Sequence, residues 1–153
     1  MKKIISAGAA LLAMALLPGT SAEARTRACG LTPKTVVTRF MQTFYIEKQV
    51  RRAFETWVAP GYIQHNPRAR TGRDAAIAFL EPFFANSPGL SYELKRIIAD
   101  GNLVAVHARM RRTPDDRGSA VVDILRVEGC KIVEHWDVVQ PVPETSANDN
   151  TMF

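Results

Sequence analysis

The sequence contains few of the residues and motifs on which many enzyme and metal sites depend. Its 153 residues include only two cysteines and three histidines. C-x-x-C, G-x-S-x-G and a glycine-rich phosphate loop are absent, and no segment repeats. The histidines occur at neither of the close spacings, H-x-H and H-x-x-x-H, that are frequent in zinc sites. The sequence therefore predicts neither a metal site nor a cofactor.

A strong charge of one sign is also missing. Twenty lysines and arginines face fifteen acidic residues, for a net charge of +5. The arginines occur in small separate groups, at 51–52, 68–73 and 109–112, without interleaved aromatic side chains or a nucleic-acid-binding motif. Most of them are expected on the solvated surface. The sequence therefore predicts no nucleic-acid partner.

The one long apolar run lies at the N-terminus. Lys2 and Lys3 precede a mainly apolar run over residues 4–17, and small residues follow as far as Ala24. This order is typical of a secretory signal peptide, with an apolar run too short to span a bilayer comfortably. We expect cleavage after Ala24 and a periplasmic or secreted product without a stable membrane anchor. An uncleaved anchor is the alternative.

Removal of residues 1–24 from the 153 leaves 129 residues, and loss of Lys2, Lys3 and Glu23 lowers the net charge from +5 to +4. A chain of this length forms one domain with a sizeable core. We therefore expect a single domain over residues 25–153.

Two cysteines, Cys29 and Cys130, remain in the expected mature chain. An oxidising compartment permits a disulfide between them. Such a bond would close a loop of about 100 residues and stabilise the fold by about 4 kcal/mol in the chain-entropy model. Two free thiols are the alternative, and we expect the disulfide.

Three helices are predicted, from residue 32 to about 44, at 48–58 and at 72–86. Apolar side chains recur at helical spacing in each. Pro82 is expected to kink or shorten the third helix. The short segment YIQHNP, residues 62–67, is expected to be extended and to end at its Asn-Pro pair.

Four strands are predicted after the helices, at 90–99, 102–112, 118–127 and 130–140. They are rich in β-branched residues and separated by turn residues such as Asp-Gly and Glu-Gly. Helices followed by an antiparallel meander indicate an α+β fold in which the helices cover one face of the sheet.

Ionisable residues lie in these strands where a purely structural strand would be apolar. Because residues two apart share a face of a strand, Asp123 belongs to the otherwise apolar row of Val121 and Leu125. His135 and Asp137 share a face in the last strand in the same way. Alternation alone leaves two interpretations open: a buried functional carboxylate, or an outer face on which Asp123 meets solvent.

Four segments, in their order along the chain, carry a resemblance to a known family: YIQHNP, GRDAAIAFL, IIADGNLVAVHARM and AVVDILRVEGCKIVEHWDVVQPVPE. The sequence resembles the SnoaL-like polyketide cyclases of the nuclear transport factor 2-like superfamily over residues 33–144. The resemblance implies a cone-shaped roll, with three N-terminal helices packed on a curled antiparallel sheet and a pocket between them.

The resemblance also implies which residues form the site. Asp123 matches the strand aspartate that serves as acid and base in the cyclases, and His107 matches a histidine of the neighbouring strand. Asp137 matches the position of a pocket acid in related epoxide hydrolases, whose accompanying arginine and second aspartate have no evident counterpart here. The other expected pocket residues are Tyr62, His65 and His135.

The chemistry implied by this resemblance is a cofactor-independent aldol or isomerase reaction on a small carbonyl compound. A carboxylate in an apolar cavity can take a proton from an acidified carbon and return it, while a histidine stabilises the enolate oxygen. A non-catalytic module that binds a small apolar ligand is the alternative. We also expect a homodimer, because a row formed by Ile132, Trp136 and Val138 is too apolar to face water.

Overall fold

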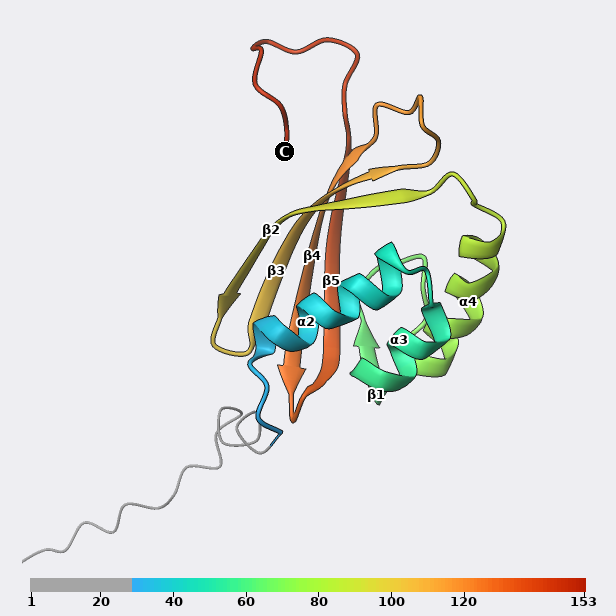
Figure 1. The fold of residues 1–153 in the computed structure, drawn as a ribbon, viewed down its shortest axis with the longest axis vertical. Helices are drawn as coiled ribbons and strands as arrows, with labels where there is room; N and C mark the ends of the chain where they lie inside the picture. Colours follow the sequence, from blue (N-terminus) through green and yellow to red (C-terminus); the bar gives the residue numbers. More distant parts are fainter. Residues whose placement is uncertain (1–28) are drawn as a thin grey trace, which may run out of the picture.

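The structure is a computed structural model that describes residues 29–153, so the expected signal peptide, residues 1–24, lies outside the described residues. Three α-helices and a short π-helix pack on one five-stranded sheet (Figure 1). The helical elements are α2 (Pro33–Met41), η1 (Gln42–Ile46), α3 (Val50–Trp57) and α4 (Arg73–Ala85). In the part of the chain that the structure describes, no helix is long and apolar enough to cross a membrane.

The sheet is curled and has the strand order β1-β5-β4-β3-β2. Its strands are β1 (Val58–Gln64), β2 (Ser91–Asp100), β3 (Leu103–Arg111), β4 (Ser119–Glu128) and β5 (Lys131–Pro141). In Figure 1, α2 lies across the sheet, while α3 and α4 lie beside β1. We call the face that packs on the helices the inner face and the opposite one the outer face.

The predicted α+β fold is confirmed, with two differences in detail. The helices are not all N-terminal to the sheet, because α4 lies between β1 and β2 in the chain. The sheet is mixed, because β1 pairs with β5 in parallel whereas the other pairs are antiparallel. Strands β1 and β5 are far apart in the sequence, so no hairpin forces them to run in opposite directions.

The core forms where the apolar stripe of α2 meets the inner face. The helix begins at Thr32, whose side chain accepts a hydrogen bond from the Thr35 amide at 3.1 Å, and Pro33 fills the first helical position. The stripe residues Val36 and Val37 are fully buried, as predicted. Helix α4 continues through Pro82 to Ala85, so the proline does not shorten it.

A bulge in the β4–β5 pair changes which residues of β5 share a face. Val127 pairs with Ile132 but Arg126 pairs with Glu134, which inserts one residue into β5. Ile132 therefore lies in the core with no exposed surface, whereas Trp136 lies on the outer face. The expectation that Ile132 shares a row with Trp136 and Val138 is therefore wrong. The extra residue of the bulge moves Ile132 to the face opposite the one that strict alternation predicts.

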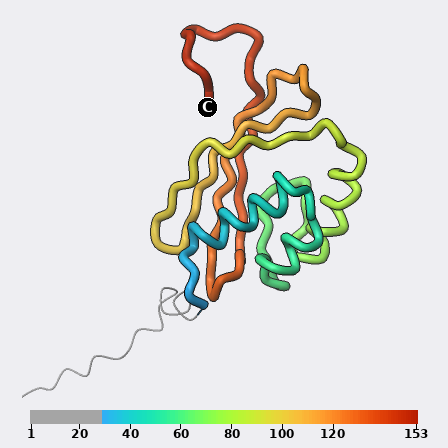
Figure 2. Tube along the Cα trace, viewed as in Figure 1, coloured from blue at the N-terminus to red at the C-terminus, as the bar shows by residue number. Residues whose placement is uncertain are grey.

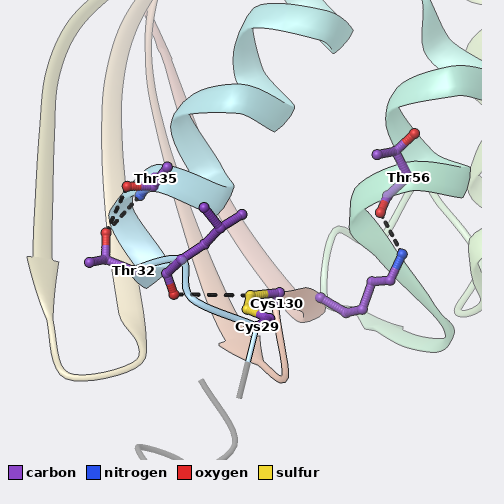
Figure 3. Close-up of a disulfide and its surroundings, with 7 residues drawn as sticks. Cys29, Thr32, Thr35, Thr56 and Cys130 are labelled. Carbon is purple, nitrogen blue, oxygen red and sulfur yellow. Dashed lines mark hydrogen bonds between the residues drawn. A yellow bond between two sulfur atoms is a disulfide. The ribbon is translucent and has the colours of Figure 1, made fainter. Parts of the chain in front are cut away.

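A disulfide joins Cys29 to Cys130, whose Cα atoms are 6.1 Å apart. Figure 3 shows it between the segment that leads into α2 and the turn that connects β4 with β5. At that turn Gly129 and Cys130 both have positive φ, 53° and 63°, as a tight two-residue hairpin requires. The bond attaches the start of the described chain to the β4–β5 hairpin. It joins the two cysteines for which the sequence predicted a disulfide.

Candidate functional site

Asp123 is the one charged residue among the fully buried side chains of the described chain, with 2 % of its surface exposed. It lies on the inner face of β4 in the buried row of Val121 and Leu125. The interpretation in which Asp123 meets solvent is therefore wrong. One carboxylate oxygen, Oδ1, lies 2.9 Å from His135 Nε2, while the buried Oδ2 has no hydrogen-bond partner among the described residues. Such an orphan acceptor requires an explanation, and a ligand is one.

The second nitrogen of His135 has a fixed role. The backbone N–H of Asn66 donates to Gln64 Oε1 at 2.9 Å, which identifies this atom as the oxygen of the Gln64 side-chain amide. His135 Nδ1 lies 2.9 Å from the same oxygen. Since that oxygen only accepts hydrogen bonds, Nδ1 must carry a hydrogen and donate it.

The hydrogen on Nδ1 determines what lies between His135 and Asp123. Nε2 and Oδ1 are both acceptors when the imidazole is neutral and the carboxylate ionised, so two lone pairs would face each other at 2.9 Å. A single proton between them removes this repulsion, either as imidazolium beside carboxylate or as imidazole beside carboxylic acid. Asp123 and His135 together are therefore suited to hold and release one proton.

Asp137 completes the polar cluster on the inner face. It is the register partner of Asp123 across the β4–β5 pair. The Asn66 side-chain amide donates to both of its carboxylate oxygens, at 2.9 and 2.7 Å. Within the described residues no lysine or arginine forms an ion pair with either carboxylate. One ligand atom each from Asp123, His135 and Asp137 lie within 4.8 Å of one another, close enough to bind a single cation.

All three tyrosines of the chain, Tyr45, Tyr62 and Tyr92, lie near Asp123. Burial raises the pKa of each hydroxyl, and the negative charge of Asp123 raises it further. Tyr62 Oη accepts a hydrogen bond from Gln64 Nε2 at 3.0 Å, which leaves its own hydrogen for another acceptor. The tyrosines are therefore neutral hydrogen-bond donors around a carboxylate.

The π-helix η1 places one of these rings. It spans Gln42–Ile46 directly after α2, and single turns of this kind are frequent at functional sites. Within it, the Tyr45 ring stacks on Tyr92 with centroids 3.8 Å apart. The extra residue of the π turn explains why helical periodicity alone did not identify Tyr45 as part of the site.

The raised tyrosine pKa values predict how the fold responds to alkali. An unfolded tyrosine ionises near pH 10. Since the folded-state pKa values are higher, their contribution to stability is complete below about pH 10 and is lost as the pH rises above it. We expect tyrosinate absorbance at 295 nm to appear only together with the loss of far-UV circular dichroism. Protein in denaturant, the control, should titrate near pH 10, and tyrosinate in the folded protein at that pH would contradict the burial.

Two of the expected site residues lie on the outer face instead. His107 pairs with Val122, not with Asp123, and its Nδ1 accepts a hydrogen bond from Arg96 at 2.7 Å. Its ring also lies 6.0 Å from that of Phe153, at the end of the C-terminal tail that folds back beyond β5 in Figure 2. The expectation that His107 and Asp123 point inward together is wrong. His107 shares a face with its register partner Val122, and Asp123, the next residue of β4, points to the opposite face.

His65 is the other displaced residue. Its Nε2 lies 2.8 Å from Glu134 Oε1 and its ring stacks on Trp136 at 4.7 Å, both on the outer face. The expectation that His65 lines the pocket is therefore wrong. Alternation explains this, since Tyr62 and Gln64 of β1 point inward and His65, the residue that follows β1, points to the other side. Gln64 and Asn66, which sequence reasoning missed, share the inward side of YIQHNP with Tyr62.

A cleft of about 520 Å³ opens between the start of α3 and the end of α4. Its lining residues include Lys48, Arg51, Glu81 and Phe84, and none of the expected site residues. The ring of Phe84 lies 6.1 Å from that of Tyr45, which in turn stacks on Tyr92. A layer of aromatic rings therefore leads from this cleft toward the cluster around Asp123.

Comparison with known proteins agrees with this architecture. A family model described as SnoaL-like domain matches residues 37–135, well over half of the chain. No curated protein sequence matches this chain.

Several solved structures share the fold at low sequence identity. An uncharacterised cystatin-fold protein from Novosphingobium aromaticivorans is 19 % identical, with a TM-score of 0.61 over 71 % of this chain and 99 % of that one. A candidate polyketide cyclase from Acidithiobacillus ferrooxidans is 16 % identical, with a TM-score of 0.59 over 71 % and 88 %. A candidate isomerase of the SnoaL-like family from Agrobacterium tumefaciens is 17 % identical, with a TM-score of 0.59 over 72 % and 99 %. At these identities the likeness concerns the fold.

Proposed function

Because the chain belongs to the SnoaL-like domain family, we propose that it binds a small carbonyl compound between helices and sheet and moves a proton on it with Asp123. The buried Asp123 carboxylate carries this proposal. Its Oδ2 has no partner among the described residues, while Oδ1 is held by His135. Oδ2 accepts a proton from the carbon next to the carbonyl, which leaves an enolate. In an isomerisation the proton returns to another carbon of the enolate. In an aldol closure the enolate carbon forms a bond to a second carbonyl carbon of the same compound, and the proton passes to the oxygen of that carbonyl. The reaction is an isomerisation or an intramolecular aldol closure.

The surrounding residues have supporting roles in this scheme. His135 compensates the charge changes of Asp123, since the proton between Nε2 and Oδ1 can shift toward either atom. Tyr62 replaces the expected His107 as donor to the enolate oxygen, because its hydroxyl hydrogen is available. General acid–base groups of this kind contribute about 10²–10⁴-fold in rate.

Exchange of carbon-bound hydrogen tests the proposal. The purified mature chain is incubated in D₂O with a set of small ketones and 1,3-dicarbonyl compounds, and deuterium incorporation next to the carbonyl is followed by NMR. We expect exchange above the buffer rate for at least one compound. Binding of such a compound without exchange would favour the non-catalytic ligand-binding module.

We also propose that the protein is exported and acts in the periplasm or outside the cell. The signal-peptide pattern of residues 1–24 suggests this, and the Cys29–Cys130 disulfide supports an oxidising compartment. Intact-mass measurement of protein exported by a bacterial host should give a chain that begins at Arg25. A mature chain that retains Met1 would contradict this.

A homodimer through the outer face is a further proposal. Register partners on four strands form an outer apolar row, Ile98, Ala105, Ile124 and Trp136. Ile98 is 64 % exposed, and Val138 on the same face is 68 % exposed. Surfaces of this kind are frequent interaction sites. The row replaces the expected one, in which Ile132 was included.

We predict a dimer by light scattering at micromolar concentration and a monomer for Val138→Glu, which introduces a charge into this surface. Val139→Glu is the matched control, because Val139 is exposed on the opposite face of the same strand. A monomeric wild-type protein, or equal effects of the two variants, would contradict an outer-face dimer.

A further inference from the structure

We propose that Asp123, His135 and Asp137 form a binding site for one first-row divalent metal ion, for which Zn²⁺ is the probe. This inference goes beyond the proton transfer proposed above and does not depend on turnover of any carbonyl compound. It rests on the positions, tautomer and charge of the three side chains.

One distance is already close to that between two ligands of one metal ion. His135 Nε2 and Asp123 Oδ1 are 2.9 Å apart. Two ligands that each lie about 2.1 Å from one ion are about 3.0–3.4 Å apart in octahedral or tetrahedral geometry. One ligand atom each from Asp123, His135 and Asp137 lie within 4.8 Å of one another. Small side-chain movements would therefore bring all three around one ion.

The neighbouring residues prepare these side chains as ligands. His135 donates its Nδ1 hydrogen to Gln64 Oε1, which leaves the Nε2 lone pair directed toward Asp123. Asn66 donates to both oxygens of Asp137 and fixes its orientation. Metal-binding histidines and carboxylates are usually oriented by such partners.

The charges around the site favour a cation. Asp123 and Asp137 are register partners on one face, and like charges in this position destabilise a sheet. Asp123 is 98 % buried, its Oδ2 has no partner in the described chain, and no described lysine or arginine pairs with either carboxylate. A divalent ion would compensate both carboxylates and use the orphan oxygen.

The ligand chemistry selects the class of ion. One imidazole and two carboxylates suit a first-row transition ion or Zn²⁺ better than Mg²⁺, which prefers oxygen ligands and water. The ion would take the place of the proton between Nε2 and Oδ1. Metal-loaded protein is therefore expected to lose the proposed proton transfer.

Titration calorimetry of the EDTA-treated mature chain with Zn²⁺ tests the site. We expect one Zn²⁺ per chain, and affinity at least tenfold weaker in Asp123→Asn and in His135→Gln. His65→Gln is the matched control and should bind as the wild type does, because His65 and Glu134 form the other histidine–carboxylate pair of the described chain.

A second measurement needs no variant. X-ray absorption of the Zn²⁺-loaded wild type should show one imidazole among oxygen ligands. Absence of stoichiometric binding, loss of binding in His65→Gln alone, or a zinc shell with two imidazoles or a thiolate would overturn the proposal. Failure of the deuterium exchange would not, since Zn²⁺ binding is measured without a carbonyl substrate.

Discussion

Replacement of Asp123 by asparagine is expected to raise the melting temperature at pH 7 while it lowers deuterium exchange by about 10²–10⁴-fold. Asparagine has nearly the shape of aspartate, and its side-chain amide can donate to His135 Nε2, so the 2.9 Å contact is kept. The substitution removes one of two carboxylates that lie opposite each other on the inner face. A gain of about 1 kcal/mol in the free energy of unfolding would raise the melting temperature by several degrees.

This combination of greater stability and lost activity is what a residue retained for chemistry should show. Two histidine variants provide the comparison. His135→Gln should lose exchange as Asp123→Asn does, whereas His107→Gln should retain it, because His107 lies on the outer face beside Arg96. If Asp123→Asn retains full exchange and melts as the wild type does, Asp123 has no role in the proposed reaction.

Loss of the disulfide is expected to have the largest effect on stability. Cys29 and Cys130 are 101 residues apart in the sequence, and a cross-link over such a loop contributes about 4 kcal/mol in the chain-entropy model. Urea denaturation of the double variant Cys29→Ser/Cys130→Ser should therefore show a free energy of unfolding lower by about this amount.

Reductant supplies the matched comparison for this variant. Reduced wild type should unfold at the same urea concentration as the double variant, and the variant should not respond to reductant. Equal stability of oxidised wild type and double variant would contradict a bond that constrains the unfolded chain. Peptide mapping without reductant should find Cys29 linked to Cys130.

The sequence predicted the sheet well because its strands alternate clearly and its turns contain glycine. Each observed strand after α4 agrees with its predicted bounds within one residue. Alternation also placed Asp123 in one row with Val121 and Leu125, and the structure shows that this row is buried. Alternation could not decide which face was the inner one, since both rows of β4 are mainly apolar.

The histidine partner of Asp123 could not be predicted from alternation alone. Residues on neighbouring strands meet only if the register is known, and the register here places His107 beside Val122. His135 reaches Asp123 diagonally across β4 and β5, from the position opposite Leu125. The bulge between Arg126 and Val127 decides which β5 residues share the inner face with Asp123. Nothing in the local sequence identifies that bulge.

The parallel pairing of β1 with β5 has a consequence for the order of events during synthesis of the chain. Gln64 and His135 are 71 residues apart, and β5 is the last of the described strands to leave the ribosome. A nascent chain that ends before β5 has both Asp123 and Gln64 but lacks the imidazole that bridges them. Contacts between such distant segments form slowly. The polar cluster therefore cannot assemble before β5 has been synthesised, and a folding intermediate without β5 would hold Asp123 with no histidine beside it.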